Sequence, residues 1–187
     1  MKNKKIIIIS AVTIMIISAG LLYFYQYRSN EKAKKDEMNN EIELVESEIE
    51  DETNQNELKD GTLGILKIEK INMKGLVKEG STSDILQNYI GHIENTPKYD
   101  GNICLAAHNR GNTYSYFAKL NQLSEGDEIK YQTIFGESYF SVNQIKEINE
   151  NDWSMLEDSD ENKLTLITCI KNKSSSRLCV QATRKDI

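Results

Sequence analysis

The sequence predicts a mainly β protein, built as a closed barrel of seven or eight strands with one or two short helices and preceded by an N-terminal apolar helix. Three observations lead to this prediction. Residues 6–25 carry no charge, residues 31–60 are densely charged, and from Gly61 short apolar runs alternate with glycine and polar turns. The last pattern has the strand spacing of an all-β domain. Closure removes the exposed edge strands that an open sheet leaves.

The run at residues 6–25, IIIISAVTIMIISAGLLYFY, is predicted to be a transmembrane anchor. Twenty helical residues that rise about 1.5 Å each cover roughly 30 Å, the thickness of a bilayer's hydrocarbon core. The aromatic residues at 23–25 fit a membrane interface. The small residues at 18–20 leave a cleaved signal peptide as an alternative, although the apolar run continues past them.

Basic residues flank this run on both sides, so the positive-inside rule leaves its orientation open. Residues 1–5 are a short basic N-terminus, and residues 26–60 are predicted to be an acidic stalk. We interpret the stalk as a solvated, partly helical linker, because it is rich in charge and poor in aromatic residues. Four apolar residues with a 4-3-4 spacing leave a short helical seam as the alternative: Met38, Ile42, Val45 and Ile49.

The folded domain is predicted to span residues 61–187. Its length suits a single domain with a proper core. Two segments, 81–90 and 114–123, have helical patterns. Seven segments have strand patterns: 63–70, 73–80, 101–108, 127–134, 138–148, 163–170 and 177–184.

The charge distribution argues against nucleic acid as a partner. The whole chain has a formal net charge of -6, and residues 31–60 carry twelve of its 29 acidic groups. The folded domain is therefore close to neutral, with its basic residues scattered. It lacks the basic footprint that binding to a phosphate backbone requires.

Three residues supply the groups that nucleophilic cysteine catalysis needs, namely a thiolate, an imidazole and donors for an oxyanion. Cys169 ends the predicted strand LTLITCI, His108 ends CLAAH, and Arg177 begins the strand after the polar segment KNKSSSR. A hairpin-like connection would bring Cys169 and Arg177 to the same end of adjacent antiparallel strands. A buried structural thiol, a capping histidine and a solvated arginine remain the alternatives for each residue alone.

The combination of motifs resembles the sortases. The resemblance is carried by TLITC at 165–169, LAAH ending at His108, the arginine that follows the cysteine, and YFAKLNQLSEGDEI at 116–129. It covers the whole predicted domain. It implies a membrane-anchored cysteine transpeptidase with an eight-stranded barrel that works outside the cell. The pattern is most similar to class D sortases, with class A as the near alternative.

The resemblance also implies roles for individual residues. Cys169 would attack the Thr-Gly carbonyl of an LPxTG-like sorting signal and form a thioacyl enzyme. His108 would protonate the leaving amine and later deprotonate the incoming amine of the cell wall or its peptidoglycan precursor. Arg177 would hold the substrate and stabilise the oxyanion.

Supporting roles are expected for Thr168 and Ala107, beside the two reacting residues, and for His92, which the family pattern places before the catalytic histidine. His92 remains an alternative acid–base residue, because it is the only other histidine. Strand packing is the simpler interpretation of Thr168.

No cofactor or metal is expected. Cys104 and Cys179 are interpreted as core thiols, because by analogy with the family barrel they lie two strands apart, too far for a disulfide, and no pair has zinc-ligand spacing. The acidic run at 157–161 lacks the spaced ligands and glycine of a dedicated calcium loop, so we interpret it as a solvated turn.

By analogy, the N-terminus lies in the cytoplasm and the barrel lies outside the cell membrane. General surface anchoring is expected rather than pilus assembly, because no lid or second span is predicted before Ile187. A cysteine hydrolase and a non-catalytic surface scaffold or adhesion module are the two alternatives to a transpeptidase.

Overall fold

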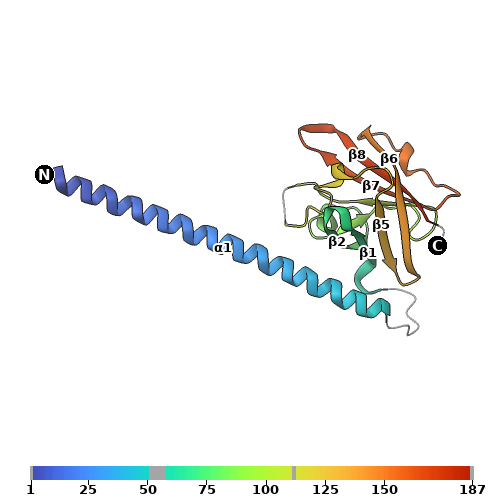
Figure 1. The fold of residues 1–187 in the computed structure, drawn as a ribbon, viewed down its shortest axis with the longest axis horizontal. Helices are drawn as coiled ribbons and strands as arrows, with labels where there is room; N and C mark the ends of the chain where they lie inside the picture. Colours follow the sequence, from blue (N-terminus) through green and yellow to red (C-terminus); the bar gives the residue numbers. More distant parts are fainter. Residues whose placement is uncertain (1, 51–57, 111–112, 186–187) are drawn as a thin grey trace. The chain divides into compact units, whose positions relative to one another are not determined.

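Eight strands close into a barrel in the computed structural model of the protein, in the order β1-β2-β3-β4-β7-β8-β6-β5 (Figure 1). The structure describes residues 2–50, 58–110 and 113–185, and side chains from residue 11 onward within the first range. The β2–β3 and β4–β7 pairs are parallel, and the other six pairs are antiparallel. The prediction of a closed, mainly β barrel is therefore confirmed.

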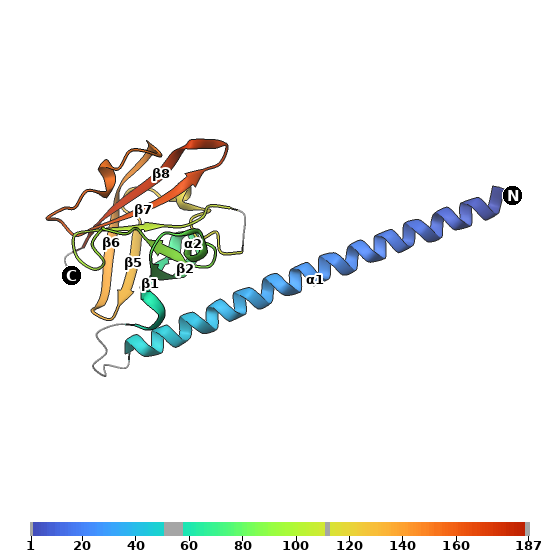
Figure 2. The same cartoon turned by 180° about the vertical axis from the view of Figure 1, so that it is seen from behind.

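The barrel strands differ greatly in length. They are β1 (Thr62–Ile68), β2 (Met73–Glu79), β3 (Ile90–His92), β4 (Asn102–Ala106), β5 (Glu128–Thr133), β6 (Gly136–Asn149), β7 (Lys163–Ile170) and β8 (Lys173–Arg184). The helices are α1 (Lys2–Glu50), α2 (Ser83–Leu86) and the 3-10 turns η1 (Lys59–Gly61), η2 (Glu69–Ile71), η3 (Leu120–Gln122) and η4 (Ser154–Leu156). Figure 2 shows α2 beside β2.

The seven predicted strands all exist, but the eighth, β3, was missed. Its first residue, Ile90, is the last residue of the segment predicted to be helical, and only Ser83–Leu86 of that segment form a helix, as α2. Three residues are too few to show an alternating pattern. The barrel nevertheless depends on β3, because this strand bridges β2 and β4.

The prediction of a helix over 114–123 was wrong, although the predicted apolar face was right in part. Turns precede the single 3-10 turn η3, yet Phe117, Leu120 and Leu123 are all buried in the core. These side chains are buried in the core without a continuous helix, because tertiary packing outweighs a weak local helix propensity.

The polar segment after Cys169 forms a β-hairpin, as expected for the connection between Cys169 and Arg177. Only Lys171 and Asn172 separate β7 from β8, and Asn172 has the positive φ of 64° that asparagine tolerates. The two strands pair Ile170 with Lys173 and Cys169 with Arg177. Three serines, residues 174–176, are therefore extra on β8 and form a bulge next to the cysteine.

Helix α1 is continuous from Lys2 to Glu50, so residues 31–50 of the predicted stalk are helical. Residues 51–57 of that stalk, and the side chains of residues 6–10 of the predicted span, lie outside what the structure describes. Within the described part, we find no helix that is both long and apolar enough to cross a membrane.

The chain divides into two compact units, residues 1–41 and residues 42–187. Within the second unit, Ile42 and Val45 at the end of α1 are buried. The ion pair between Glu46 and Lys74 of β2, at 2.7 Å, ties this short helical end to the barrel. Two of the four apolar residues with the predicted 4-3-4 spacing, Ile42 and Val45, are thus buried within the unit that contains the barrel.

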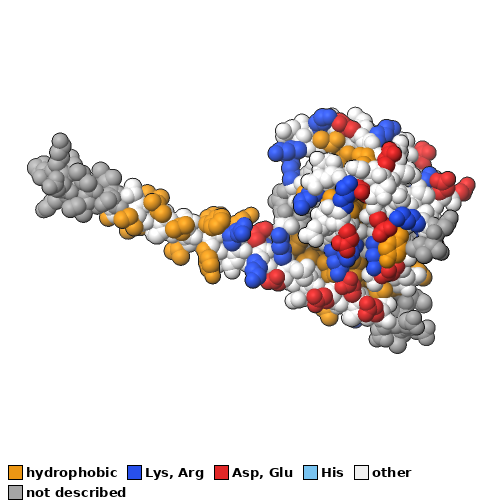
Figure 3. All heavy atoms as spheres, in the orientation of Figure 1, with side chains coloured by type: hydrophobic (Ala, Val, Ile, Leu, Met, Phe, Trp, Pro, Cys, Tyr) orange, Lys and Arg blue, Asp and Glu red, His pale blue; other side chains and the backbone are white. Residues whose placement is uncertain are grey.

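Intermixed acidic and basic side chains cover the visible face of the barrel, which agrees with its nearly neutral charge (Figure 3). The core beneath is built from the inward faces of the strands, with Leu66, Ile90, Leu105, Leu166 and Val180 fully buried. The same strands leave their ends at the rim, where polar side chains gather.

Gly64 lies where β1 passes β5 with no room for a side chain. A Cβ atom there would meet the carbonyl oxygen of Gln132 directly and would lie 3.1 Å from the methyl group of Thr133. We expect Gly64→Ala to lower the free energy of unfolding by about 2–3 kcal/mol, because the backbone must shift to admit the methyl group. Urea unfolding followed by circular dichroism measures this, with Gly20→Ala, which meets no atom within 4 Å, as the control.

Candidate active site

Cys169 lies at the rim of the barrel, at the penultimate position of β7. The preceding strand residues Leu164, Thr165 and Leu166 are buried, whereas the cysteine side chain is exposed. The β-branched residues that favour the strand therefore end where the thiol reaches solvent. A nucleophile needs this access, and a structural core thiol does not.

His108 lies two residues beyond the end of β4, because this strand ends two residues earlier than predicted. Because β4 and β7 run parallel, with Ala106 opposite Ile167, the next two residues of each segment continue side by side. The Ala107 N–H donates to the Ile167 carbonyl at 3.4 Å, and the Thr168 hydroxyl donates to the Ala107 carbonyl at 2.7 Å. The backbones of His108 and Cys169 therefore lie about one strand spacing apart, which is roughly 5 Å.

Arg177 is the direct cross-strand partner of Cys169 on β8. Side chains at opposite positions of an antiparallel pair share a face, with Cβ atoms about 4.5–5.5 Å apart. The guanidinium is held by the serine bulge, because Nη1 donates to the carbonyls of Ser174 at 2.7 Å and Ser176 at 3.0 Å. Nη2 donates to the Glu150 carboxylate at 2.9 Å.

Asn109 adds a contact that sequence reasoning missed. Its side-chain amide donates a hydrogen bond to the backbone carbonyl of Cys169. The bond ties the segment that carries His108 to the end of β7, beyond the last backbone contacts of the two strands. The only signal in the sequence is the place of an amide residue directly after the histidine.

A cavity of about 730 Å³ opens beside these residues. Its floor includes Ala106 of β4, Ile148 of β6 and Ile167 of β7, and Arg177 lines it. Trp153 and Leu156 line it from the loop between β6 and β7. An apolar floor with a few convergent polar groups is typical of a ligand site.

Four carboxylates also line this cavity: Glu94, Glu150, Asp152 and Glu157. Hydrogen bonds from the hydroxyl and backbone amide of Ser81 lower the pKa of the Glu94 carboxyl, and those from Ser154 lower the pKa of the Asp152 carboxyl. Both groups are therefore ionised at neutral pH. Sequence reasoning identified none of the four as site residues, because they lie on loops whose shape the strand pattern does not give.

A second cavity of about 280 Å³ is lined by the end of β7. Cys169, Thr168 and Asn109 line it together with Phe117 and Leu178. The thiol therefore faces a cavity distinct from the one lined by Arg177.

The supporting residues named from the sequence lie in different places. Thr168 and Ala107 are buried and bonded to each other between β7 and the end of β4. His92 is 1% exposed in β3, where its ring contacts the Pro97 carbonyl at 3.0 Å, the Thr96 hydroxyl at 3.1 Å and the Glu79 carboxylate. Nε2 thus contacts the β3–β4 segment, and Nδ1 contacts Glu79 of β2.

Cys104 and Cys179 are free, buried thiols of the core. Burial raises the pKa of each to about 12. They stay protonated at neutral pH, so their chemistry is that of small apolar side chains.

An exposed cysteine at the rim of a closed β-barrel, with a histidine after one neighbouring strand and an arginine on the other, has the residue types that cysteine acyl transfer requires, and comparison with known proteins identifies the family. The sortase domain family model matches residues 66–185. Sortase A of Bacillus anthracis is 24% identical over 200 residues, which cover 97% of this chain and 95% of that protein. Sortase D of Bacillus subtilis (strain 168) is 28% identical over 109 residues, which cover 57% of this chain and 53% of that protein.

Solved structures agree. The crystal structure of sortase C1 from Streptococcus agalactiae superposes with a TM-score of 0.66 and 26% identity, covering 75% of this chain and 77% of that chain. The chain belongs to the sortase family and is a cysteine transpeptidase.

The three cysteines are expected to differ sharply in reactivity, because the thiolate is the nucleophile. At pH 7.5 iodoacetamide should label Cys169 in the folded protein and leave Cys104 and Cys179 unlabelled, since their pKa values lie near 12. Peptide mass spectrometry after timed labelling measures this. Labelling of all three cysteines at similar rates would contradict the argument from burial. Labelling of the unfolded protein in urea is the control, because all three thiols should then react.

Asn109→Ala removes the bond that joins the histidine segment to the Cys169 carbonyl. We expect kcat for peptide transfer to fall roughly tenfold, as the loss of about 1 kcal/mol of positioning implies. Thermal unfolding should change little, because Asn109 is only half-buried. Unchanged turnover in a folded variant would show that the two segments hold their places without this contact.

Proposed function

We propose that the protein cleaves an LPxTG-like sorting signal between Thr and Gly and transfers the attached protein to an amine of the cell wall or its precursor. The observation that carries this proposal is the convergence of three segments at one rim of the barrel. The end of β7 carries Cys169, and it lies between the end of β4, before His108, and the part of β8 that carries Arg177. The chemistry of acyl transfer needs those three side chains in reach of one peptide bond.

In the first half of the reaction, the Cys169 thiolate attacks the threonine carbonyl carbon. A C–S bond forms, the C–N bond to glycine breaks, and His108 gives its proton to the leaving amine. The guanidinium of Arg177 stabilises the oxyanion while the carbon is tetrahedral. Its Nη1 hydrogens are already bonded to the serine bulge, so the remaining hydrogens on Nε and Nη2 are the donors for the substrate.

In the second half, the acceptor amine attacks the thioester. His108 takes the proton from this amine, a new C–N bond forms, and the C–S bond breaks to restore the thiolate. The cavity of about 280 Å³ suits the acceptor, because Cys169 lines it and Arg177 does not. The cavity of about 730 Å³ suits the sorting signal, since its apolar floor fits the leucine and proline of an extended peptide.

We also propose that residues 6–25 anchor the protein in the cell membrane, with residues 1–5 in the cytoplasm and the barrel outside. Support comes from the twenty uncharged residues and the aromatic residues that end them. The helical backbone of α1 through this run agrees with such an anchor. Membrane fractionation with protease treatment of intact cells tests the proposal: the barrel should be degraded from outside.

The decisive experiment incubates the full chain with LPxTG-like peptides and follows the mass of Cys169. A thioester adduct is expected, and Cys169→Ala should abolish it, whereas Cys104→Ala, which removes a buried thiol, should retain it. His108→Ala is expected to slow turnover by about 10²–10⁴-fold, and Arg177→Ala by about 10²–10³-fold. Absence of any adduct with a panel of such peptides would reject the proposal.

An added amine distinguishes transfer from hydrolysis. A transpeptidase should yield amide product in preference to free acid, because the acceptor captures the thioacyl intermediate before water does. Chromatography of the products with and without the amine measures this partition. Free acid alone at every amine concentration would identify a cysteine hydrolase.

A further inference from the structure

The loop between β6 and β7, residues 150–162, forms one wall of the cavity of about 730 Å³. Trp153, Leu156 and Glu157 line the cavity from this loop, across from Ile93 and Thr96. The only regular structure in the loop is the single turn η4. A surface loop of this length is ordinarily mobile unless something holds it.

Asn102, the first residue of β4, holds the middle of this loop. Its side chain is buried, with 1% of the residue exposed. The side-chain amide donates to the Met155 carbonyl at 2.9 Å and to the Glu157 carbonyl at 2.8 Å. Its backbone N–H lies 3.5 Å from the carboxylate of Asp158. Both amide hydrogens are therefore used on the loop.

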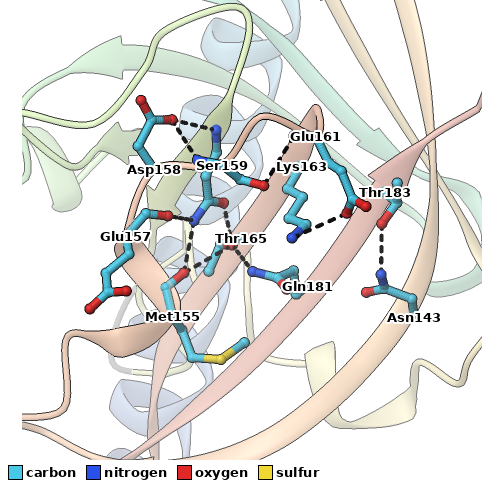
Figure 4. Close-up of polar contacts among 11 residues, drawn as sticks. Asn143, Met155, Glu157, Asp158, Ser159, Glu161, Lys163, Thr165, Gln181 and Thr183 are labelled. Carbon is cyan, nitrogen blue, oxygen red and sulfur yellow. Dashed lines mark hydrogen bonds and ion pairs between the residues drawn. The ribbon is translucent and has the colours of Figure 1, made fainter.

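The orientation of the Asn102 amide is fixed from the barrel side. The Thr165 hydroxyl, fully buried on β7, donates to Asn102 Oδ1 at 2.7 Å. The same hydroxyl oxygen accepts from Gln181 Nε2 of β8 at 3.0 Å (Figure 4). The Thr165 hydroxyl oxygen accepts a hydrogen bond from Gln181, and the hydroxyl hydrogen points to Asn102 Oδ1. The Nδ2 group of Asn102 therefore faces the loop.

The end of the loop is tied to the residue next to Asn102. The Gly101 N–H donates to Asn162 Oδ1 at 2.8 Å, and the Lys163 N–H donates to the Gly101 carbonyl at 2.8 Å. The start of the loop is held separately, since the Glu150 N–H donates to the Ser175 carbonyl at 2.8 Å. Asn102 is thus a buried anchor at the loop's middle, and the buried Thr165 hydroxyl also lies 3.5 Å from the Met155 carbonyl.

We infer that Asn102 is a positioning residue that keeps the β6–β7 loop preformed as the wall of the substrate cavity. The inference rests on the proposed function, which assigns this cavity to the sorting signal. A loop that is already ordered adds no ordering cost when the peptide binds. Asn102 pairs with Lys163, six residues before Cys169 on β7, which corresponds to roughly 20 Å along the strand. It therefore acts on substrate binding and lies too far away to contact the reacting atoms.

The test compares Asn102→Ala with Asn143→Ala in the full chain. Asn143 is a matched control, because its amide also bonds a threonine hydroxyl between two strands, that of Thr183 at 2.6 Å, but on the exposed surface away from the cavity (Figure 4). Asn102→Ala should raise KM for an LPxTG-like peptide about tenfold, while kcat changes less than about twofold. The rate of Cys169 alkylation by iodoacetamide should be unchanged. Asn143→Ala should alter none of these values.

Trp153 reports on the loop directly, because it is the single tryptophan of the chain and is 63% exposed. Acrylamide quenching of its fluorescence should roughly double in Asn102→Ala, and its anisotropy should fall, as expected when a buried anchor is lost. A folded Asn102→Ala variant with wild-type Trp153 fluorescence, or with wild-type KM, would overturn the inference.

Two further measurements cover the case in which Asn102→Ala does not fold. Thr165→Val keeps the shape of the side chain but removes the hydroxyl that orients Asn102, and it should shift KM and Trp153 quenching in the same direction by a smaller factor. In the wild-type protein, time-resolved anisotropy should show Trp153 moving with the barrel, and dominant nanosecond local motion would overturn the inference. Failure of the wild type to form a thioester would reject the proposed function while leaving the Trp153 results interpretable.

Discussion

The parallel pairing of β4 with β7 is the constraint on which the candidate site depends. Two parallel strands end at the same edge of a sheet, so the segments that carry His108 and Cys169 leave the barrel together. An antiparallel pairing of the same strands would separate these residues by roughly 20 Å, the length of β4 and its exit. Beyond the last backbone hydrogen bonds between the two segments, the side chain of Asn109 adds one more bond, to the Cys169 carbonyl.

Position in the barrel also separates three chemically identical thiols. Cys104 and Cys179 lie within strands and are fully buried, which raises their pKa to about 12. Cys169 lies at a strand end, where the same fold exposes it. The surrounding barrel therefore decides which thiol can react, because solvent and charged groups stabilise a thiolate only at the rim.

The rim is built by segments that are rigid for different reasons. The serine bulge of β8 presents two carbonyls to the Arg177 guanidinium, and Glu150 adds a carboxylate. The β6–β7 loop is held at its middle by the buried amide of Asn102. The candidate site thus combines strand ends, which place Cys169 and His108, with loops fixed by hydrogen bonds, which line the cavity.

The sequence alone determined the strands that carry the chemistry. The run at 163–170 was predicted with the bounds of β7, because β-branched residues alternate there up to the cysteine. The motifs around His108, Cys169 and Arg177 carried the resemblance to the sortases. Local pattern was misleading over 114–123, where apolar residues at helical spacing enter the core from turns.

Only the tertiary structure decided how these strands meet. The three-residue β3, the parallel register of β4 on β7, the serine bulge and the anchor at Asn102 all depend on partners far away in the chain. A side chain such as Asn102 looks like an ordinary polar residue at the start of a strand until the loop of residues 150–162 folds over it. Local sequence sets propensity and periodicity, whereas the closure of the barrel decides which residues 53 to 63 positions apart become hydrogen-bond partners.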